Sequence, residues 1–142
     1  MFETRSAIIT LKGSKLAPLN TLEQLRGAHL GHANGSIVPD YLKALDTDVQ
    51  PIAGDDYFNR GLKMVELKRF DAYFAPTLTN AQYMVKKYEG VEAMSVQPLP
   101  VETMPLYAVF SKSMDEKTFL RLDNLISANL GRYKALLAPY IR

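Results

Sequence analysis

This sequence predicts an α/β fold with a mostly parallel sheet flanked by helices, because short β-branched and apolar segments alternate with segments of helical spacing. Helix signals separate the strand segments: residues 21–24 form one capping box and residues 113–116 form another. The 142 residues are 47% hydrophobic and 23% charged, which suits one globular domain with a sizeable core.

The strand segments are apolar runs that end at a turn residue. The first, 6–11, contains Ala-Ile-Ile-Thr-Leu and ends before Gly13, and a later one, 71–75, ends at Pro76. Residues 94–99 are expected to be extended. In chain order, the expected strands are 6–11, 28–33, 49–53, 71–75 and 106–110.

The helical segments have apolar residues three and four positions apart. The longest begins at the capping box 113–116 and is expected to end at Gly131, with Phe119, Leu122 and Ile126 on one face. The other expected helices are a very short one opened by 21–24, one over 37–45, one opened by 54–56, one after Pro76 and a final amphipathic turn over 133–140.

Composition and motifs exclude several functional classes. The net charge of +2 is too small to indicate a nucleic-acid partner or an acidic membrane, and the absence of cysteine excludes disulfides and thiol chemistry. No phosphate loop, nucleophile elbow or zinc-protease motif is present, so we expect a binding module rather than an enzyme, without a cofactor. His29 and His32 point to opposite faces of a strand and no third ligand is evident, so we expect no metal site.

Ligands of open α/β sheets lie beyond the carboxyl ends of strands, near helix N-termini. The first such place is residues 32–36, where Gly35 and Ser36 are expected to open a helix whose N–H groups attract an anion. The alternative is that Asn34, Gly35 and Ser36 only cap the helix. His32 ends the strand beside them, where it could donate to a ligand, sense pH or simply fill space. The second place is residues 74–77.

Five sequence pieces, in order, resemble the bacterial extracellular solute-binding protein family 3, which has the type II periplasmic binding protein fold. The resemblance extends from about residue 21 to the end of the chain. The pieces are Leu-Glu-Gln-Leu-Arg-Gly at 22–27, Asn-Gly-Ser at 34–36, Tyr-Leu at 41–42, Arg-Phe-Asp-Ala-Tyr-Phe at 69–74, and Leu-Tyr-Ala-Val-Phe-Ser-Lys at 106–112 followed by Gly-Arg-Tyr at 131–133.

The resemblance implies two lobes joined by two hinge strands, with solute bound in the cleft between the lobes. Residues 2–11 would form the first hinge crossing and 102–110 the return. We therefore expect residues 1–110 to be a solute-binding lobe with both hinge-crossing strands, and 111–142 to be a C-terminal helical segment that normally packs on the first lobe. The N-terminal half of that first lobe has no counterpart here, so the chain resembles a fragment or a truncated gene product.

The resemblance also suggests individual ligand contacts. Gly35 and Ser36 stand where the second lobe of the family meets a ligand's anionic group. Pro76 or Thr77 stands where the amino-acid binders carry a carboxylate for the ligand ammonium, which argues against an ordinary α-amino acid. Arg5 lies in the first crossing segment, where it would either reach an anionic solute or face solvent.

The implied function is the solute-binding component of an ABC-type uptake system, which binds a small polar or anionic solute and engages a permease, or a sensor coupled to a histidine kinase. Such proteins are periplasmic; no signal peptide is visible here, so we expect the export signal to lie upstream or the product not to be exported. The alternative is a truncated or degenerate domain that serves as a sensor or dimerisation module without binding solute. The apolar face of the helix over 114–130 would then be covered in a homodimer, by domain swapping.

Overall fold

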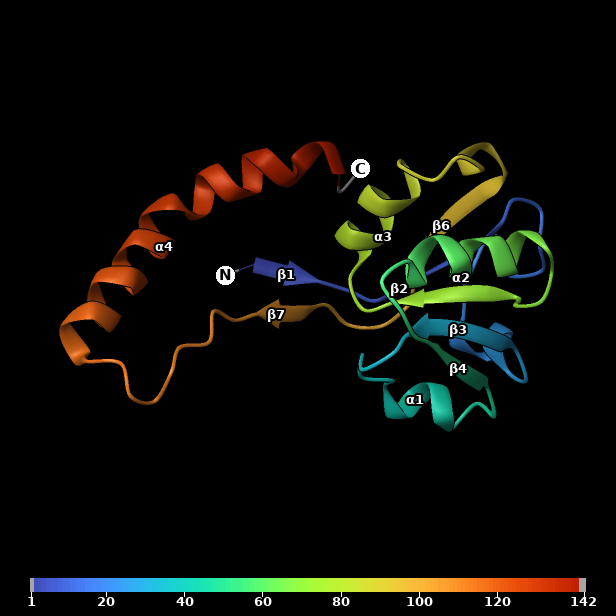
Figure 1. Ribbon diagram of the computed structural model, residues 1–142, viewed down its shortest axis with the longest axis horizontal. Coiled ribbons are helices and arrows are strands. Elements are labelled where there is room, and N and C mark those ends of the chain that lie inside the picture. Colours follow the sequence, from blue (N-terminus) through green and yellow to red (C-terminus); the bar gives the residue numbers. More distant parts are fainter. Residues whose placement is uncertain (1, 141–142) are drawn as a thin grey trace.

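The computed structural model describes residues 2–140, and a five-stranded sheet forms its centre (Figure 1). The strand order is β4-β3-β5-β2-β6, and β1 and β7 form a separate two-stranded arm. The strands are β1 (Phe2–Thr4), β2 (Ala7–Leu11), β3 (His29–Ala33), β4 (Asp48–Ile52), β5 (Ala72–Ala75), β6 (Met94–Pro98) and β7 (Met104–Leu106). The helices are α1 (Asp40–Lys43), α2 (Tyr57–Glu66), α3 (Leu78–Val85) and α4 (Glu116–Leu137), with 3-10 turns η1 (Leu22–Leu25), η2 (Val91–Ala93) and η3 (Ala138–Tyr140).

The sheet confirms the expected α/β class, although its pairing is mixed. Strand β3 is parallel to β4 and to β5, whereas β2 is antiparallel to both β5 and β6. Strands β3, β4, β5 and β6 therefore run in one direction and β2 runs in the other. The reversal follows from the β1–β7 arm: β2 enters the sheet from β1, at the edge where β3, β4 and β5 end.

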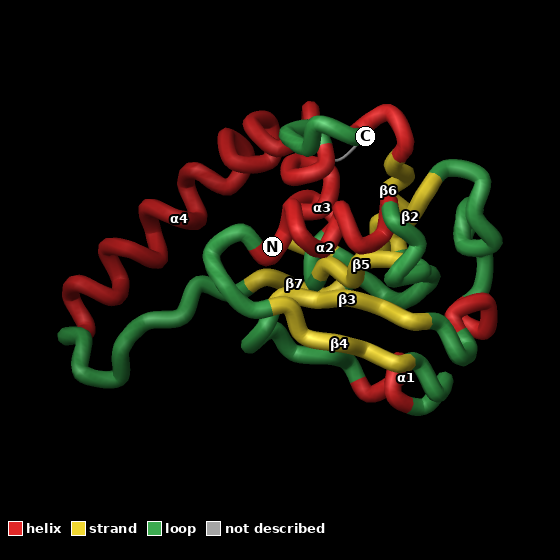
Figure 2. The backbone as a smooth tube through the Cα atoms, turned by 45° about the vertical axis from the view of Figure 1, so that its right-hand side comes forward, coloured by secondary structure: helices red, strands yellow, loops and turns green. Residues whose placement is uncertain are grey.

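Two hydrophobic cores lie on the two faces of the sheet, because successive side chains of a strand point to opposite faces. Ile9 and Tyr73 pack with α2 and α3 on one face, while Ile8 and Phe74 pack with α1 and η1 on the other. Figure 2 shows α2 and α3 on one side of the sheet and α1 on the other. The helical spacing predicted for α2 is confirmed, since Phe58, Leu62 and Val65 are all buried.

The helix ends and the last strand differ from the sequence expectation. Helix α1 is one turn that begins at Asp40, because the ring of Pro39 fixes φ at −62° and disfavours helical backbone at Val38. Strand β7 is Met104–Leu106 rather than 106–110, because pairing with β1 fixes its position. Helix α4 continues through Gly131 to Leu137, since one glycine costs a helix only about 1 kcal/mol and good helix formers follow it.

Helix α4 extends away from the sheet and returns to it only at its C-terminal end (Figure 1). There the Lys86 Nζ donates a hydrogen bond of 3.2 Å to the Pro139 carbonyl, which joins η3 to α3. No residue of α4 whose side chain is described is fully buried. The side chains described for the helix beyond residue 110 are therefore all partly or fully exposed.

A pair of glycine substitutions tests how closely α2 packs on the sheet. A Cβ on Gly61 would lie 2.5 Å from the Tyr73 ring, which also packs edge-to-face with Phe58, whereas a Cβ on Gly131 meets nothing within 4 Å. We expect Gly61→Ala to destabilise the fold by about 1–3 kcal/mol through overpacking. Gly131→Ala should stabilise α4 by about 0.5–1 kcal/mol. Urea unfolding followed by circular dichroism measures both, and equal effects would contradict the close contact at Gly61.

Candidate functional site

The carboxyl ends of the parallel strands meet at one edge of the sheet, next to the β1–β7 arm (Figure 1). Strand β2 begins at this edge, since Ala7 pairs with Ala75 at the end of β5. Residues Arg5 and Ser6 connect β1 to β2 here. This edge is where ligands of α/β sheets bind, so it is the candidate site.

Backbone hydrogen bonds fix the connection between β1 and β2. The Leu78 N–H donates to the Arg5 carbonyl at 2.7 Å, and the Leu99 N–H donates to the Ser6 carbonyl at 2.9 Å. The Ser6 hydroxyl donates to the Pro76 carbonyl at 3.3 Å. Arg5 is thereby held against the first turn of α3, so the predicted residues Arg5 and Thr77 come together although they are far apart in sequence.

A groove of about 350 Å³ lies at this junction. The segments around β1 and before β7 contribute to it, and so does the first turn of α3. Its walls carry one guanidinium, one carboxylate and three threonine hydroxyls. The lining residues are Glu3, Thr4, Arg5, Leu78, Thr79, Pro98 and Thr103.

The charges of the groove suit a polar solute that carries a negative group. Arg5 is partly buried and forms no ion pair with any residue that the structure describes. The Glu3 carboxylate accepts a hydrogen bond of 3.1 Å from the Thr103 hydroxyl. Thr77 caps α3 by accepting from the Asn80 N–H at 3.3 Å, and the positive end of the helix dipole adds to the charge of Arg5.

Residues 32–36, the first ligand site that the sequence predicted, contain the end of β3 and a turn after it. The Ser36 hydroxyl donates to the Ala33 carbonyl at 2.6 Å and lies 3.0 Å from the His32 Nδ1. Because the hydroxyl has one proton, this arrangement places a proton on Nδ1 of the ring. Gly35 has a φ of +82°, a backbone conformation that favours glycine. Asn34 and Gly35 are both exposed to solvent.

Two expectations about this turn are wrong. Gly35 and Ser36 do not open a helix, because α1 begins four residues later at Asp40, and they do not cap one. The Ser36 hydroxyl is already engaged within the turn, so its role here is to close the turn. The turn also lines no part of the groove that contains Arg5, although His32 pairs with Phe74 on the neighbouring strand β5.

Sequence reasoning missed Glu3 and Thr79 as site residues. Glu3 is two residues before Arg5 on an extended segment, so both side chains point to the same side of it. Thr79 lies in the first turn of the helix that Thr77 caps. The alternation of the hinge strand and the capping pattern are the signals that could have identified them.

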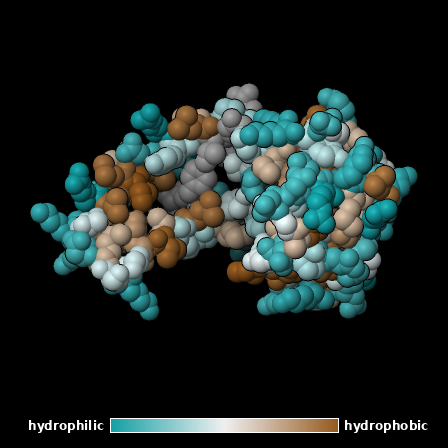
Figure 3. Space-filling view, in the orientation of Figure 1, coloured by the Kyte–Doolittle hydropathy of each residue, from teal (hydrophilic) through white to brown (hydrophobic). Residues whose placement is uncertain are grey.

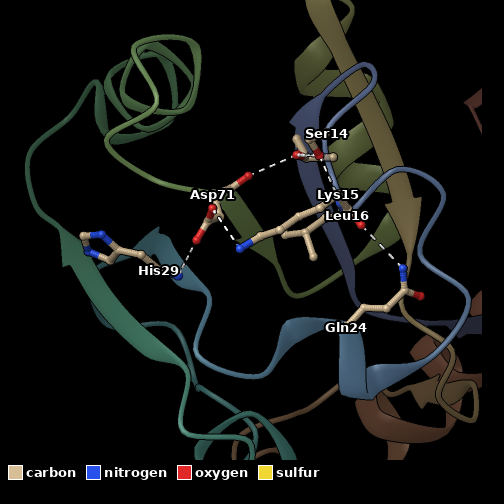
Figure 4. A network of polar contacts seen from close by, with 7 residues as sticks. Ser14, Lys15, Leu16, Gln24, His29 and Asp71 are labelled. Atoms are coloured by element: carbon tan, nitrogen blue, oxygen red, sulfur yellow. Dashed lines mark hydrogen bonds and ion pairs between the residues drawn. The ribbon is translucent and has the colours of Figure 1, made fainter.

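Asp71 lies at the opposite edge of the sheet and is structural. Its carboxylate accepts a hydrogen bond of 2.9 Å from the His29 N–H and lies 3.6 Å from the Lys15 Nζ (Figure 4). The Asp71 N–H in turn donates to the His29 carbonyl, and its own carbonyl accepts from Thr10. These contacts align β3 with β5, as expected for a residue at the start of the strand.

Among residues 2–140, no group of three or more His, Cys, Asp or Glu side chains is arranged to hold a metal ion. Within the same residues, no helix combines the length and the apolar composition needed to cross a membrane.

No family model matches the sequence, and no curated protein sequence matches it. Solved structures do match. An ancestral cationic amino acid solute-binding protein superposes with a TM-score of 0.72 at 16% identity, over 99% of this chain and 59% of that one. For the GluR0 ligand-binding core in complex with L-glutamate, the TM-score is 0.72 at 12% identity, over 99% of this chain and 61% of that one. For the unliganded, open L-cystine solute receptor of Neisseria gonorrhoeae, the TM-score is 0.58 at 20% identity, over 98% of this chain and 56% of that one.

These likenesses confirm the expected fold, that of type II periplasmic binding proteins. The chain spans about three fifths of the length of the first matching structures, which are covered to 59% and 60%. The matched part includes α4, because 99% of this chain is superposed.

The buried ring of His32 predicts a pH dependence of stability. Burial lowers the pKa of His32, while the backbone of Ala33 opposes this effect more weakly. The unfolded state, with an ordinary pKa of about 6.5, then takes up a proton more readily than the folded state. Stability should therefore be complete above about pH 6.5 and fall as pH decreases through the folded pKa.

Nuclear magnetic resonance titration of the His32 ring and urea unfolding at several pH values measure this effect. His32→Gln should flatten the dependence, whereas the control His29→Gln leaves His32 in place and should keep it. A His32 pKa at or above the ordinary value would contradict the prediction.

Proposed function

We propose that this chain, which has the fold of type II periplasmic binding proteins, is the second lobe and C-terminal segment of a solute-binding protein. Residues 1–110 form the lobe with both hinge crossings, and 111–142 form a helical segment that packs on a first lobe. The solute is small and polar or anionic, and it binds in the cleft between the lobes. The protein serves an ABC-type uptake system.

The observation that carries this proposal is the groove at the hinge. It is formed by both crossing segments, which carry Arg5 and Thr103, and by the N-terminal turn of α3. A solute held there would touch the hinge and one lobe together. Closure of a second lobe over the same groove would then couple solute binding to a change in hinge angle.

The groove suggests the chemistry of the solute. Arg5 and the α3 N-terminus favour a carboxylate or another anionic group, and Glu3 offers one acceptor for a donor group. Pro76 follows β5 where a carboxylate would hold an ammonium group, so an ordinary α-amino acid is disfavoured. Organic acids and amides therefore come first among the candidates.

The function needs more than this lobe. A pocket normally buries ~70–90% of a small ligand, and one lobe covers only one side of it, so the isolated chain should bind weakly. In the complete two-lobe protein, the partner is a transporter permease or a sensor histidine kinase. The location is the periplasm, and the protein acts by binding rather than by catalysis.

Ligand titrations test the proposed site directly. Backbone amide spectra of the full chain should shift saturably on addition of succinate, malate or succinamate, at residues next to Arg5, Thr79 and Thr103. Arg5→Gln should weaken binding of the anionic probe about tenfold or more, because it removes a charge-assisted hydrogen bond. The control Arg121→Gln, on α4, should bind as the unmodified chain does.

The panel should be extended to other organic acids and phosphorylated compounds before a negative result is accepted. Absence of saturable shifts at these residues across the whole panel would contradict the proposed solute site. Shifts that Arg5→Gln leaves unchanged would contradict the assignment of Arg5.

A second candidate function, as a dimerisation module without solute binding, is favoured by the surface of α4. Leu125, Tyr133 and Leu136 are each at least half exposed, and they lie on one stripe of the helix with Leu122 and Ile126. Figure 3 shows hydrophobic side chains gathered over this part of the molecule. A second copy would cover the stripe, by domain swapping if the C-terminal segments exchange.

Two leucines on different sides of α4 have nearly the same exposure, so they provide a variant and a matched control. Leu125 is 51% exposed on the apolar stripe, and Leu120 is 50% exposed on the other side. If the stripe holds a dimer, Leu125→Ser should shift the mass measured by light scattering toward the monomer. Leu120→Ser should leave the mass unchanged. A monomeric unmodified chain at high concentration would exclude this second candidate.

A further inference from the structure

A second pocket, of about 460 Å³, lies at the edge of the sheet opposite the hinge groove. Three lysines line it: Lys12 and Lys15 in the turn after β2, and Lys68 just after α2. Val65 and Phe70, both buried, form an apolar floor. The pocket is therefore cationic at its rim and apolar at its base.

The lysines outnumber the acidic groups of the pocket. Asp71 is the acidic residue that lines it, and its carboxylate already accepts from the His29 N–H and faces Lys15 (Figure 4). Lys12 and Lys68 form no ion pair within the described part of the chain. With Lys15 balanced by Asp71, two positive charges remain for an outside partner.

The backbone at Lys68 is a second and independent observation. Lys68 has a φ of +56°, in the left-handed region that favours glycine. It ends α2, with its N–H donating to the Val65 carbonyl at 2.9 Å and the next N–H, that of Arg69, donating to the Met64 carbonyl at 2.8 Å. Glycine is the residue that this helix-ending geometry prefers, so a lysine is present at a conformational cost. Such a cost at the rim of a pocket is a sign of function.

We propose that this pocket binds a phosphate monoester with a small carbon skeleton. Lys12 and Lys68 would contact the phosphate oxygens, and the partly exposed side chain of Leu11, which lines the pocket with Val65 and Phe70, would contact the carbon skeleton. The apolar floor distinguishes this partner from a bare inorganic ion. The site lies at the opposite edge of the sheet from Arg5, so it stands or falls independently of the proposed solute site.

Amide spectra of the full chain titrated with glycerol 3-phosphate at constant ionic strength test the proposal. We expect saturable shifts at Gly13, Ser14 and Lys68, and weaker binding of inorganic phosphate than of the ester. Lys68→Gln should weaken binding about fivefold or more, and Lys12→Gln should do the same. The control Lys43→Gln, on α1, should bind as the unmodified chain does.

Lys68→Gly separates a loss of ligand binding from a loss of folding stability. It relieves the left-handed strain, so its urea midpoint should rise or stay equal while its binding of glycerol 3-phosphate falls. Linear shifts spread over all lysines, or saturable binding that Lys68→Gln and Lys68→Gly leave intact, would overturn the site.

Vesicles distinguish the source of the phosphate monoester. Binding of free glycerol 3-phosphate without sedimentation on vesicles indicates a soluble ligand. Sedimentation with phosphatidylcholine vesicles containing phosphatidic acid, lost in Lys68→Gln, indicates a lipid headgroup. Either result supports the pocket, and failure of both overturns it.

Discussion

The junction between β1 and β2 is the constraint on which the rest of the structure depends. The carbonyls of Arg5 and Ser6 accept hydrogen bonds from the N–H groups of Leu78 and Leu99. The start of α3 and the end of β6, which are distant in sequence, are thereby joined to one point of the chain. The Ser6 hydroxyl adds a bond to Pro76. These bonds satisfy polar groups that are buried with Ser6, and they allow β2 to enter the sheet between β5 and β6. Without them, neither β2 nor the groove that contains Arg5 would have a fixed position.

The two edges of the sheet then acquire different chemistry. At the hinge edge, strand ends and the first turn of α3 bring Arg5 close to threonine hydroxyls and one carboxylate. At the opposite edge, Asp71 joins β3 to β5 and leaves lysines around a second pocket. Helix α4 extends away from both, with an exposed apolar stripe. Two hydrophobic cores hold the sheet between its helices, while both ends of the sheet and the surface of α4 remain accessible.

Much of the fold was predictable because it depends on local pattern. The spacing of Phe58, Leu62 and Val65 correctly predicted α2. The helix predicted over 37–45 instead begins at Asp40, after Pro39. The position of β7 was predicted too late in the chain, because its pairing with β1 spans about a hundred residues and no local signal marks it. The end of α4 was predicted too early, because a glycine stops a helix only when its backbone turns left-handed.

The resemblance to the solute-binding protein family suggested Arg5 and Thr77 as candidates. The sequence by itself determined the alternation of strands and helices and the absence of thiol chemistry, because these follow from composition and local periodicity. It could not determine which candidates share a site. The tertiary structure placed Arg5 in one groove with Glu3 and Thr79, used Thr77 as the cap of the neighbouring helix, and left His32 and Ser36 bonded to each other in a separate turn. The physical reason is that strand order and hydrogen bonds between distant segments decide which side chains meet, and neither is encoded in any short stretch of residues.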